Sequence, residues 1–290
     1  MNTPPLLAIA AGALIDGSLK ATVGLFGAGL LTAGPLRRAS AAQRHAVWLV
    51  ALLGAPLLVP LAALRGAAVA LDAGPTLAVW ALGAAIGLTA LLVDLWALRR
   101  LTQRATPDPA HPGLRFVEGL HGPLTWGMWR PVVLLPAVAK GWAPPAVHAV
   151  LAHERAHIRR GDWLAHLATG VVQAIFWFHP AVWWARARVA AEAEHAADDA
   201  ALAAGARPSD YAALLLSLAP ASGPGLGVGG PSLGARVRAV LDRRHRSPRR
   251  AAALALCGGL SLLALPTLGA QALWTPSTEA LECQPAPPPK

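Results

Sequence analysis

The stretch LAHERAHIRRGDWL (residues 151–164) places two histidines, His153 and His157, four residues apart, with Glu154 directly after the first. Residues at this spacing lie one turn apart on the same face of a helix, so both imidazoles can point a ring nitrogen at one ion. Glu154 can then reach a water on that ion. A catalytic zinc site needs three protein ligands and an open position, so the pattern predicts such a site if the chain supplies a third ligand.

The limits of this helix are also visible in the sequence. Pro144 and Pro145 suit the first turn of a helix, and Gly161 suits its end. On a continuous helix, Asp162 would point well away from the two histidines. We therefore expect Asp162 to cap the following helix and leave it out of the predicted site.

The third ligand is expected on the next strongly helical stretch, ARVAAEAEHAADDAAL (residues 187–202). Its polar candidates fall on two faces. Glu194 and Asp198, four apart, share one face, whereas Glu192, His195 and Asp199 gather on another. Helical geometry alone allows either face to supply a ligand.

The composition indicates a membrane protein. Of the 290 residues, 55% are hydrophobic and only 14% are charged, and the mean hydropathy is +0.46. The formal net charge is +10, but the arginines cluster beside long apolar runs, which disfavours direct nucleic-acid binding. The two cysteines, Cys257 and Cys283, form neither a disulfide framework nor a cysteine zinc motif.

Four apolar runs are long enough to cross a bilayer, at about residues 15–36, 46–64, 77–98 and 251–274. Arginines follow the first and third runs and precede the fourth, and positively charged loops stay in the cytoplasm. We therefore expect three spans within residues 1–99 and an external N-terminus. A cytoplasmic domain should cover residues 100–250, followed by the fourth span and a short, disordered external tail at 275–290.

Within the cytoplasmic region, residues 114–141 read as one or two β-hairpins that end in a strand at Val132–Leu135. Residues 163–185 carry no Asp, Glu, Lys or Arg and are long enough for a further span. A crossing would separate Glu194 from His153, and both flanks are basic, so we predict a buried or membrane-dipping segment broken near Pro180. Residues 221–234 read as a flexible linker.

These motifs together resemble the BlaR/MecR-type membrane metallopeptidases. The residues that carry the resemblance are RPVVLLP (130–136), LAHERAHIRRGDWL (151–164), FWFHPAVWW (176–184), EHAADDAAL (194–202) and YAALLLSLA (211–219). SLKATVGLF (18–26) and RHAVWLVALLGAPLLVP (44–60) in the first two apolar runs also resemble that family. The resemblance covers nearly the whole chain up to residue 274. It implies a mainly α membrane protein with four transmembrane helices and an inserted cytoplasmic α+β, zincin-like metallopeptidase domain.

Carried over residue by residue, the resemblance implies one Zn²⁺ held by His153, His157 and Glu194, with Glu154 as the general base and Asp198 supporting the ligands. The chain departs from the family in having His179 where Asn is frequent and Ala197 where Cys is frequent. It also has only sixteen residues after the last apolar run, where the β-lactam-sensing members continue into a penicillin-binding domain. Direct antibiotic sensing is therefore not expected. Tyr211 is a weak candidate for stabilising the oxyanion.

The expected function is that of an integral-membrane zinc metalloendopeptidase in a bacterial-type inner membrane. The resemblance implies a signalling role, with cleavage of a cytoplasmic transcriptional repressor or of the chain itself, and the peptide is expected to extend along Val132–Leu135. The expected partners are the lipid bilayer, this protein substrate and a second copy of the chain. The alternatives are a non-catalytic transducer that keeps the zinc fold as a scaffold, and a quality-control protease.

Overall fold

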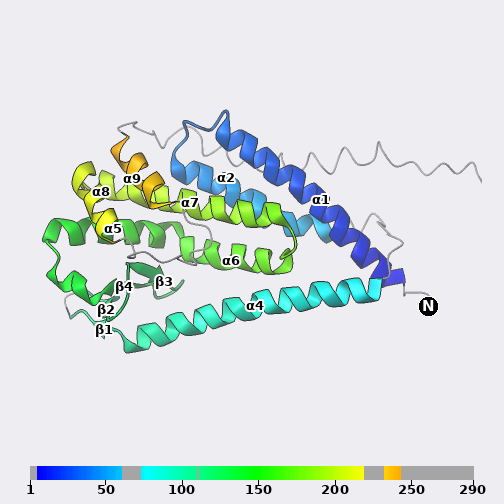
Figure 1. Ribbon diagram of the computed structural model, residues 1–290, viewed down its shortest axis with the longest axis horizontal. Helices are drawn as coiled ribbons and strands as arrows, with labels where there is room; N and C mark the ends of the chain where they lie inside the picture. The colour runs from blue at the N-terminus through cyan, green and yellow to red at the C-terminus, as the bar shows by residue number, and fades with distance from the viewer. Residues whose placement is uncertain (1–4, 61–72, 110, 219–231, 243–290) are drawn as a thin grey trace, which may run out of the picture.

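The computed structural model describes residues 5–60, 73–109, 111–218 and 232–242, and these are mostly helical (Figure 1). In chain order the helices are α1 (Pro5–Ala33), α2 (Ala41–Gly54), the short 3₁₀ helix η1 (Ala55–Leu57), α4 (Ala73–Arg104), the 3₁₀ helix η2 (Ala137–Gly141), α5 (Pro144–Arg160), α6 (Asp162–Ile175), α7 (Pro180–Ala203), α8 (Pro208–Ser217) and α9 (Leu233–Leu241). The strands are β1 (Thr106–Pro107), β2 (Leu114–Val117), β3 (Leu124–Trp126) and β4 (Val132–Pro136).

Three helical segments are long and apolar enough to cross a membrane: Ile9–Ala33, Ala41–Pro60 and Gly74–Arg104. They correspond to the first three predicted spans. The predicted fourth span at 251–274 and the tail at 275–290 lie outside the described residues. Along α4, large apolar side chains such as Leu82, Ile86 and Trp96 are more than half exposed. A face of this kind is expected to contact lipid.

Two of the helices start before the expected spans at 15–36 and 46–64. The first helix already begins at Pro5 and carries Asp16 inside it, where the Asp16 carboxylate pairs with Lys20 one turn later. The second begins at Ala41 because Ser40 and Gln43 form a capping box that satisfies the first free backbone N–H groups. It ends at Gly54, where the 3₁₀ turn containing Pro56 takes over.

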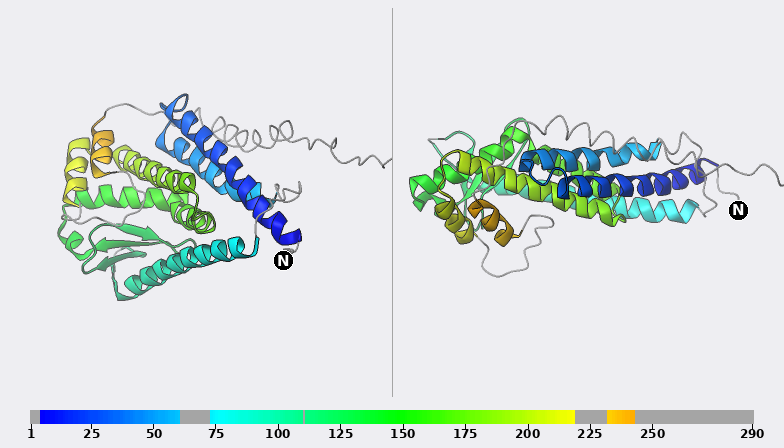
Figure 2. Two further views of the ribbon diagram at one scale, coloured as in Figure 1. Left: turned by 45° about the vertical axis from the view of Figure 1, so that its right-hand side comes forward. Right: turned by 90° about the horizontal axis from the view of Figure 1, so that it is seen from above.

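The four strands form one small sheet in the order β1-β2-β4-β3. The β3–β4 pair is antiparallel and forms one hairpin, within the one or two that were predicted, whereas β2 runs parallel to β4. The sheet lies at one end of the molecule, next to α5 and the C-terminal end of α4 (Figures 1 and 2).

The apolar segment 163–185 does not form one continuous helix. It is divided into α6 and the start of α7, with a turn before Pro180, as the sequence indicated. This turn packs against the third candidate span, since the Trp80 indole N–H donates to the Ile175 carbonyl at 2.9 Å and a side-chain carbon at Gly83 would collide with Trp177. Helix α7 then returns beside α6 (Figure 1). The C-terminal half of α7 therefore lies against α5.

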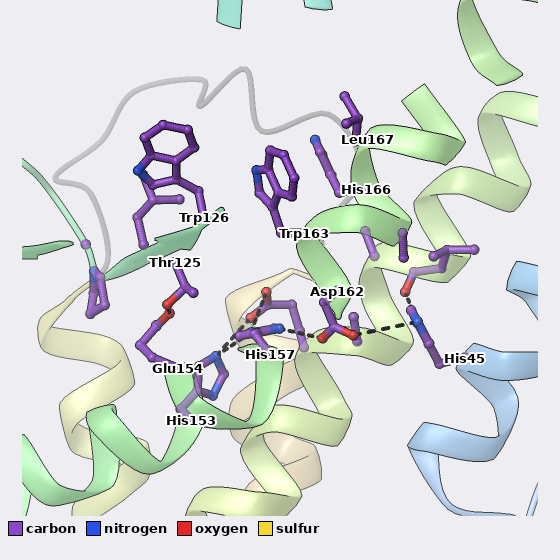
Figure 3. A pocket seen from close by; sticks show the side chains of 18 of the residues that line it. His45, Thr125, Trp126, His153, Glu154, His157, Asp162, Trp163, His166 and Leu167 are labelled. Atoms are coloured by element: carbon purple, nitrogen blue, oxygen red, sulfur yellow. Dashed lines mark hydrogen bonds and ion pairs between the residues drawn. The ribbon is translucent and has the colours of Figure 1, made fainter. Parts of the chain in front are cut away.

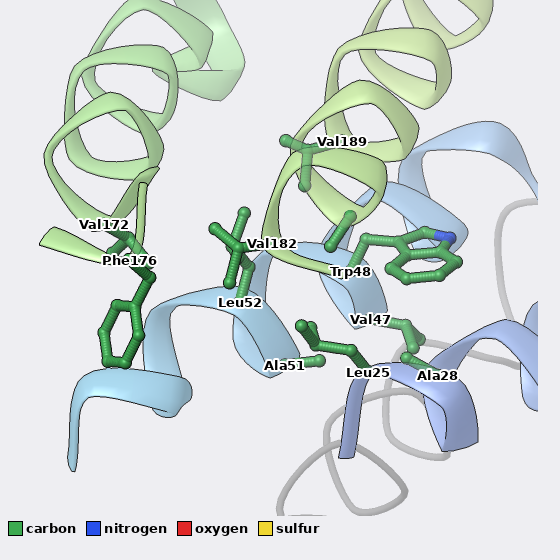
Figure 4. Packing of buried hydrophobic residues seen from close by; sticks show 11 residues of the cluster. Leu25, Ala28, Val47, Trp48, Ala51, Leu52, Val172, Phe176, Val182 and Val189 are labelled. Atoms are coloured by element: carbon green, nitrogen blue, oxygen red, sulfur yellow. The ribbon is translucent and has the colours of Figure 1, made fainter. Parts of the chain in front are cut away.

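Helices α1, α2, α6 and α7 share one apolar core. Figure 4 shows Trp48 and Leu52 of α2 packed with Leu25 of α1, Phe176, and Val182 of α7. All five side chains are fully buried. The helix that carries Glu194 is therefore packed directly on two candidate membrane spans.

The predicted linker at 221–234 lies mostly outside the described residues. Its end was placed too late, because Ser232 caps α9 and Leu233 begins that helix.

Candidate metal centre

Helix α5 supplies the first half of the site. It begins at Pro144 with prolines in its first turn and ends at Gly161, whose φ of 69° is the left-handed conformation that terminates a helix. His153 and Glu154 are buried and His157 is half-buried. The Nε2 atoms of the two histidines lie 3.1 Å apart, so both rings present the same nitrogen to one point (Figure 3).

Helix α7 brings the third group. Glu194 places one carboxylate oxygen 3.6 Å from His153 Nε2 and the other 3.7 Å from His157 Nε2. Zinc bonds of about 2.1 Å at tetrahedral angles hold ligand atoms about 3.4 Å apart, so these distances fit a three-ligand site. Within the described part of the chain, this is where three His, Cys, Asp or Glu side chains come close enough to share an ion.

The outer nitrogens of both histidines have partners. Nδ1 of His153 lies 3.2 Å from the Asp198 carboxylate and 2.9 Å from the Tyr211 hydroxyl, which itself donates to Asp198 at 2.9 Å. Nδ1 of His157 lies 2.7 Å from Asp162 Oδ2. Bonds of this kind fix the tautomer and leave Nε2 free for a metal ion. The hydroxyl of Tyr211 is therefore engaged with Asp198, which disfavours an oxyanion role.

The exclusion of Asp162 from the site was wrong. Gly161 ends α5, the chain turns, and Asp162 becomes the first residue of α6, where it lies under His157 instead of continuing along the helix away from it. It does not act as the predicted side-chain cap, because Gly161 occupies that position and the Asp162 carboxylate instead pairs with His157 and Arg160.

Two further residues of the site were missed in the sequence. Arg236 of α9 donates two hydrogen bonds to Asp198, at 2.9 and 2.6 Å, and lies 2.9 Å from Glu194. Thr125 of β3 donates to Glu154 Oε2 at 2.6 Å and so orients that carboxylate. Neither position carries a local signal, since Arg236 is one of many arginines and Thr125 belongs to a short strand of ordinary composition.

The electrostatics of the site couple its acids and bases. Burial opposes charge on His153, but its hydrogen bonds to Asp198 and Glu194 prevail and raise the pKa of this histidine to about 9. Burial likewise opposes charge on Glu194, but the His153 hydrogen bond and the Arg236 charge lower its pKa to about 2. Burial and the nearby Asp198 raise the pKa of Tyr211, so its hydroxyl keeps the proton that it donates.

This coupling predicts a pH dependence of metal binding. A metal ion needs His153 in its neutral form, so binding must release the proton that the metal-free site holds below about pH 9. Apparent affinity should therefore rise by about tenfold per pH unit as the pH increases toward 9, and fall as the pH is lowered. Competition with a metal-sensitive dye on the full chain in detergent, at several pH values, measures this slope. A flat profile between pH 6.5 and 9 would contradict it.

The other candidates on α7 do not join this group. Glu192 is buried, but it pairs with Arg44 of α2 at 2.6 Å, away from the histidines. Asp199 is exposed, and neither it nor His195 belongs to the cluster that could hold an ion. The face that carries Glu194 and Asp198 is thus the one that meets α5.

A cavity of about 570 Å³ lies over the site. Its wall includes His153, Glu154 and Glu194, the residues of β3, and Leu95 and Leu98 of α4. Trp126 and Trp163 stand above the histidines in Figure 3. The expectation that a peptide extends along Val132–Leu135 was wrong, because β4 is paired on both sides, with β2 and with β3. Among the described strands, β3 is the sheet edge that faces this cavity.

This arrangement has the groups that metal-dependent hydrolysis needs. Two neutral imidazoles and one carboxylate suit Zn²⁺, and three ligands leave a position open. A fourth group, the carboxylate of Glu154, lies beside them and is not needed as a ligand. The edge strand β3 and the cavity of about 570 Å³ give room for a peptide chain.

Comparison with known proteins agrees with this chemistry. The model of the family described as BlaR1 peptidase M56 matches residues 72–229, which is more than half of the chain. The "Regulatory protein BlaR1" of Bacillus licheniformis is 30% identical over 83 residues, and this match covers 29% of the chain but only 14% of the relative. The family match contains α4 to α8 and thus every residue proposed to bind the metal; α9, with Arg236, lies outside it.

Proposed function

This chain belongs to the BlaR1 peptidase M56 family, and on that premise we propose that it is an integral-membrane zinc endopeptidase. The observation that carries the proposal is the convergence of His153, His157 and Glu194 on one point, with Glu154 beside them and not among them. The apolar helices Ile9–Ala33, Ala41–Pro60 and Gly74–Arg104 support its membrane location.

In this proposal His153, His157 and Glu194 hold the zinc ion, and Asp198 and Asp162 fix the two imidazole rings. When bound, zinc supplies a Lewis acid that polarises a peptide carbonyl and acidifies a water. Glu154, oriented by Thr125, takes a proton from the attacking water as the new C–O bond forms, and passes it to the leaving amide nitrogen as the C–N bond breaks. Water and one peptide bond thus give a carboxylate and an amine.

The substrate is proposed to bind as an extended segment along β3. Among the described strands, β3 has one unpaired edge. Its residue Thr125 donates a hydrogen bond to Glu154, so the strand lies beside the proposed base. Adding a strand at an open edge gives a peptide backbone regular hydrogen bonds without requiring a particular sequence. Side-chain preference would then come from the cavity walls, including Trp126 and Leu98.

We propose further that the enzyme acts in signal transduction by cleaving a cytoplasmic transcriptional repressor, itself, or both. The similarity to a regulatory protein supports this, although the chain matches only a small part of that protein. The test is to compare new protein N-termini in cells that make the wild type or a His153→Ala/His157→Ala variant. A new N-terminus in a soluble DNA-binding protein, or in this chain, should appear only with the wild type. Cleavage confined to misfolded membrane proteins would favour quality control instead.

The orientation proposed here places the N-terminus outside and the metal centre in the cytoplasm. Arg37 and Arg38 after α1 are exposed, as the positive-inside argument requires, whereas the charge of Arg44 is paired with Glu192. In a Cys257→Ser/Cys283→Ser background, a cysteine at Ala70 should react with a membrane-impermeant thiol reagent in intact cells. A cysteine replacing the exposed Glu118 should react only after the membrane is opened. The opposite labelling pattern would show that the N-terminus is in the cytoplasm and the metal centre outside.

A further inference from the structure

Two adjacent residues near the start of α2, Arg44 and His45, are buried and polar within a candidate membrane span. Arg44 forms a two-pronged ion pair with Glu192 of α7, with Nε 2.9 Å and one terminal nitrogen 2.6 Å from the two carboxylate oxygens. Its other terminal nitrogen donates to the Ala39 carbonyl at 2.6 Å. Because the guanidinium is planar and bonds both carboxylate oxygens, this pair fixes the orientation of the two side chains as well as the distance between them.

His45 makes a second connection to the same helix. Its Nδ1 donates to the Val189 carbonyl at 3.0 Å. Its Nε2 lies 3.9 Å from Asp162 Oδ1, which is too long for a hydrogen bond but places the ring directly against that carboxylate (Figure 3). One turn of α2 therefore contacts both α7 and the first residue of α6.

These contacts end next to the metal centre. Glu192 precedes Glu194 by two residues on α7, and Val189 precedes it by five. Asp162 accepts the hydrogen bond from His157 Nδ1 at 2.7 Å. One proposed ligand, His157, is thus bonded to a residue that α2 touches, and a second, Glu194, lies within five residues of two others on α7. The apolar packing of Trp48 and Leu52 on α7 extends the same interface toward the other end of α2.

The buried ion pair also needs an explanation beyond stability. Removing two charges from water is costly, and a well-packed apolar pair of similar volume is often as stable as a buried ion pair. What the Arg44–Glu192 pair adds is a defined direction between two helices. This is the property that a metal site needs, because its ligands must stay within a narrow range of geometry.

We propose that Arg44 and His45 are positioning residues of the metal centre. They set the place of α7, and with it Glu194, relative to α5, and the His45 ring packs against Asp162, which accepts the hydrogen bond from His157. A displacement of α2 in the membrane is thereby transmitted to the ligand set without any direct contact between α2 and the ion. The inference rests on the proposed function in that the site must hold a metal.

The test uses the full chain in lipid nanodiscs and compares Arg44→Gln with Arg38→Gln. Arg38 lies six residues earlier and is exposed, so it controls for the loss of one positive charge. Zinc affinity is measured by chelator competition, and ligand geometry by the absorption bands of the Co²⁺-substituted protein. Arg44→Gln should weaken zinc binding by about tenfold, the low end of effects seen for residues that support ligands, and should change the cobalt bands. Arg38→Gln should match the wild type.

Further variants keep the test decisive. Arg44→Lys retains the positive charge but not the two parallel hydrogen bonds of a guanidinium. It should therefore recover part of the zinc affinity but not the wild-type cobalt spectrum. If Arg44→Gln does not fold, His45→Leu tests the same proposal, because it removes the bond to Val189 and keeps apolar volume. If these variants lower the unfolding temperature of the metal-free protein yet leave zinc affinity and the cobalt bands unchanged, the contacts are only structural and the proposal is wrong. A wild-type protein that binds neither metal would instead overturn the proposed function.

Discussion

A Glu154→Gln protein should keep its metal and its fold and lose at least about a hundredfold of its cleavage rate. The loss follows from the role proposed for Glu154, since general acid–base help is typically worth about 10²–10⁴-fold in rate. The structure explains why the fold should survive. Glutamine has the same shape, and its side-chain oxygen can still accept the hydrogen bond that Thr125 Oγ1 donates to Glu154 at 2.6 Å. Cleavage of a substrate identified from new N-termini, together with zinc content by mass spectrometry, measures both quantities.

The matched control is Glu118→Gln, the same change at an exposed carboxylate on the loop after β2. It should leave cleavage and metal content unchanged. The same pair of variants separates an enzyme from a non-catalytic transducer. If zinc-loaded Glu154→Gln protein gives full signalling output in cells, hydrolysis is not how the chain signals. If it still cleaves at the wild-type rate, Glu154 is not the base.

Much of the membrane architecture could be predicted because a bilayer imposes a simple requirement on sequence. Apolar runs near 20 residues long stand out in any chain, and three of the four predicted runs correspond to candidate spans in the described residues. The ends of the helices are harder to predict because they depend on local chemistry. Ser40 and Gln43 form a capping box that starts α2 at Ala41, and the S-x-x-Q spacing is the signal in the sequence that indicates this start.

The candidate site was predictable where helical periodicity alone places residues together. The spacing of His153 and His157 is one turn, and so is that of Glu194 and Asp198, so each pair shares a face. Which face of α7 meets α5 was not contained in that periodicity and came from the family resemblance. The face left over is occupied by a different partner, because Glu192 pairs with Arg44 from a helix about 150 residues earlier in the chain.

The residues that were missed depend on contacts that no local pattern encodes. Asp162 was excluded on the assumption of a continuous helix, but the left-handed Gly161 turns the chain and returns Asp162 to His157. Arg236 reaches Asp198 from α9, across a long separation in sequence. Both are charged groups that bind other charged groups in the folded chain, and such pairing is decided by tertiary packing. The pairing of β2 with β4 likewise joins strands that are not consecutive in sequence, and no local pattern encodes it.

Replacement of Glu194 by alanine should remove most metal binding from a folded protein. Loss of a residue that only supports a ligand typically costs about 10–100-fold in affinity, and loss of one of three ligands should exceed that. Removal of Glu194 also removes one of the groups that raise the pKa of His153, which lessens competition from protons and acts in the opposite direction. Measurement at about pH 8 keeps this second effect small, because proton competition in the wild type weakens as the pH approaches 9. We therefore expect an affinity decrease of more than about a hundredfold.

The control for this prediction has to be chosen from the structure. Glu192→Ala is unsuitable although it lies on the same helix, because it would leave the buried Arg44 guanidinium without its carboxylate and disturb α7. Asp199→Ala removes an exposed carboxylate of α7 that lies outside the proposed ligand set, and should leave zinc affinity near the wild-type value. Zinc affinity by chelator competition and helical content by circular dichroism are compared for both variants. If folded Glu194→Ala protein holds one zinc per chain as tightly as the wild type and the Asp199→Ala protein, the third ligand is another residue, and the convergence of Glu194 with His153 and His157 reflects ion pairing in the metal-free site alone.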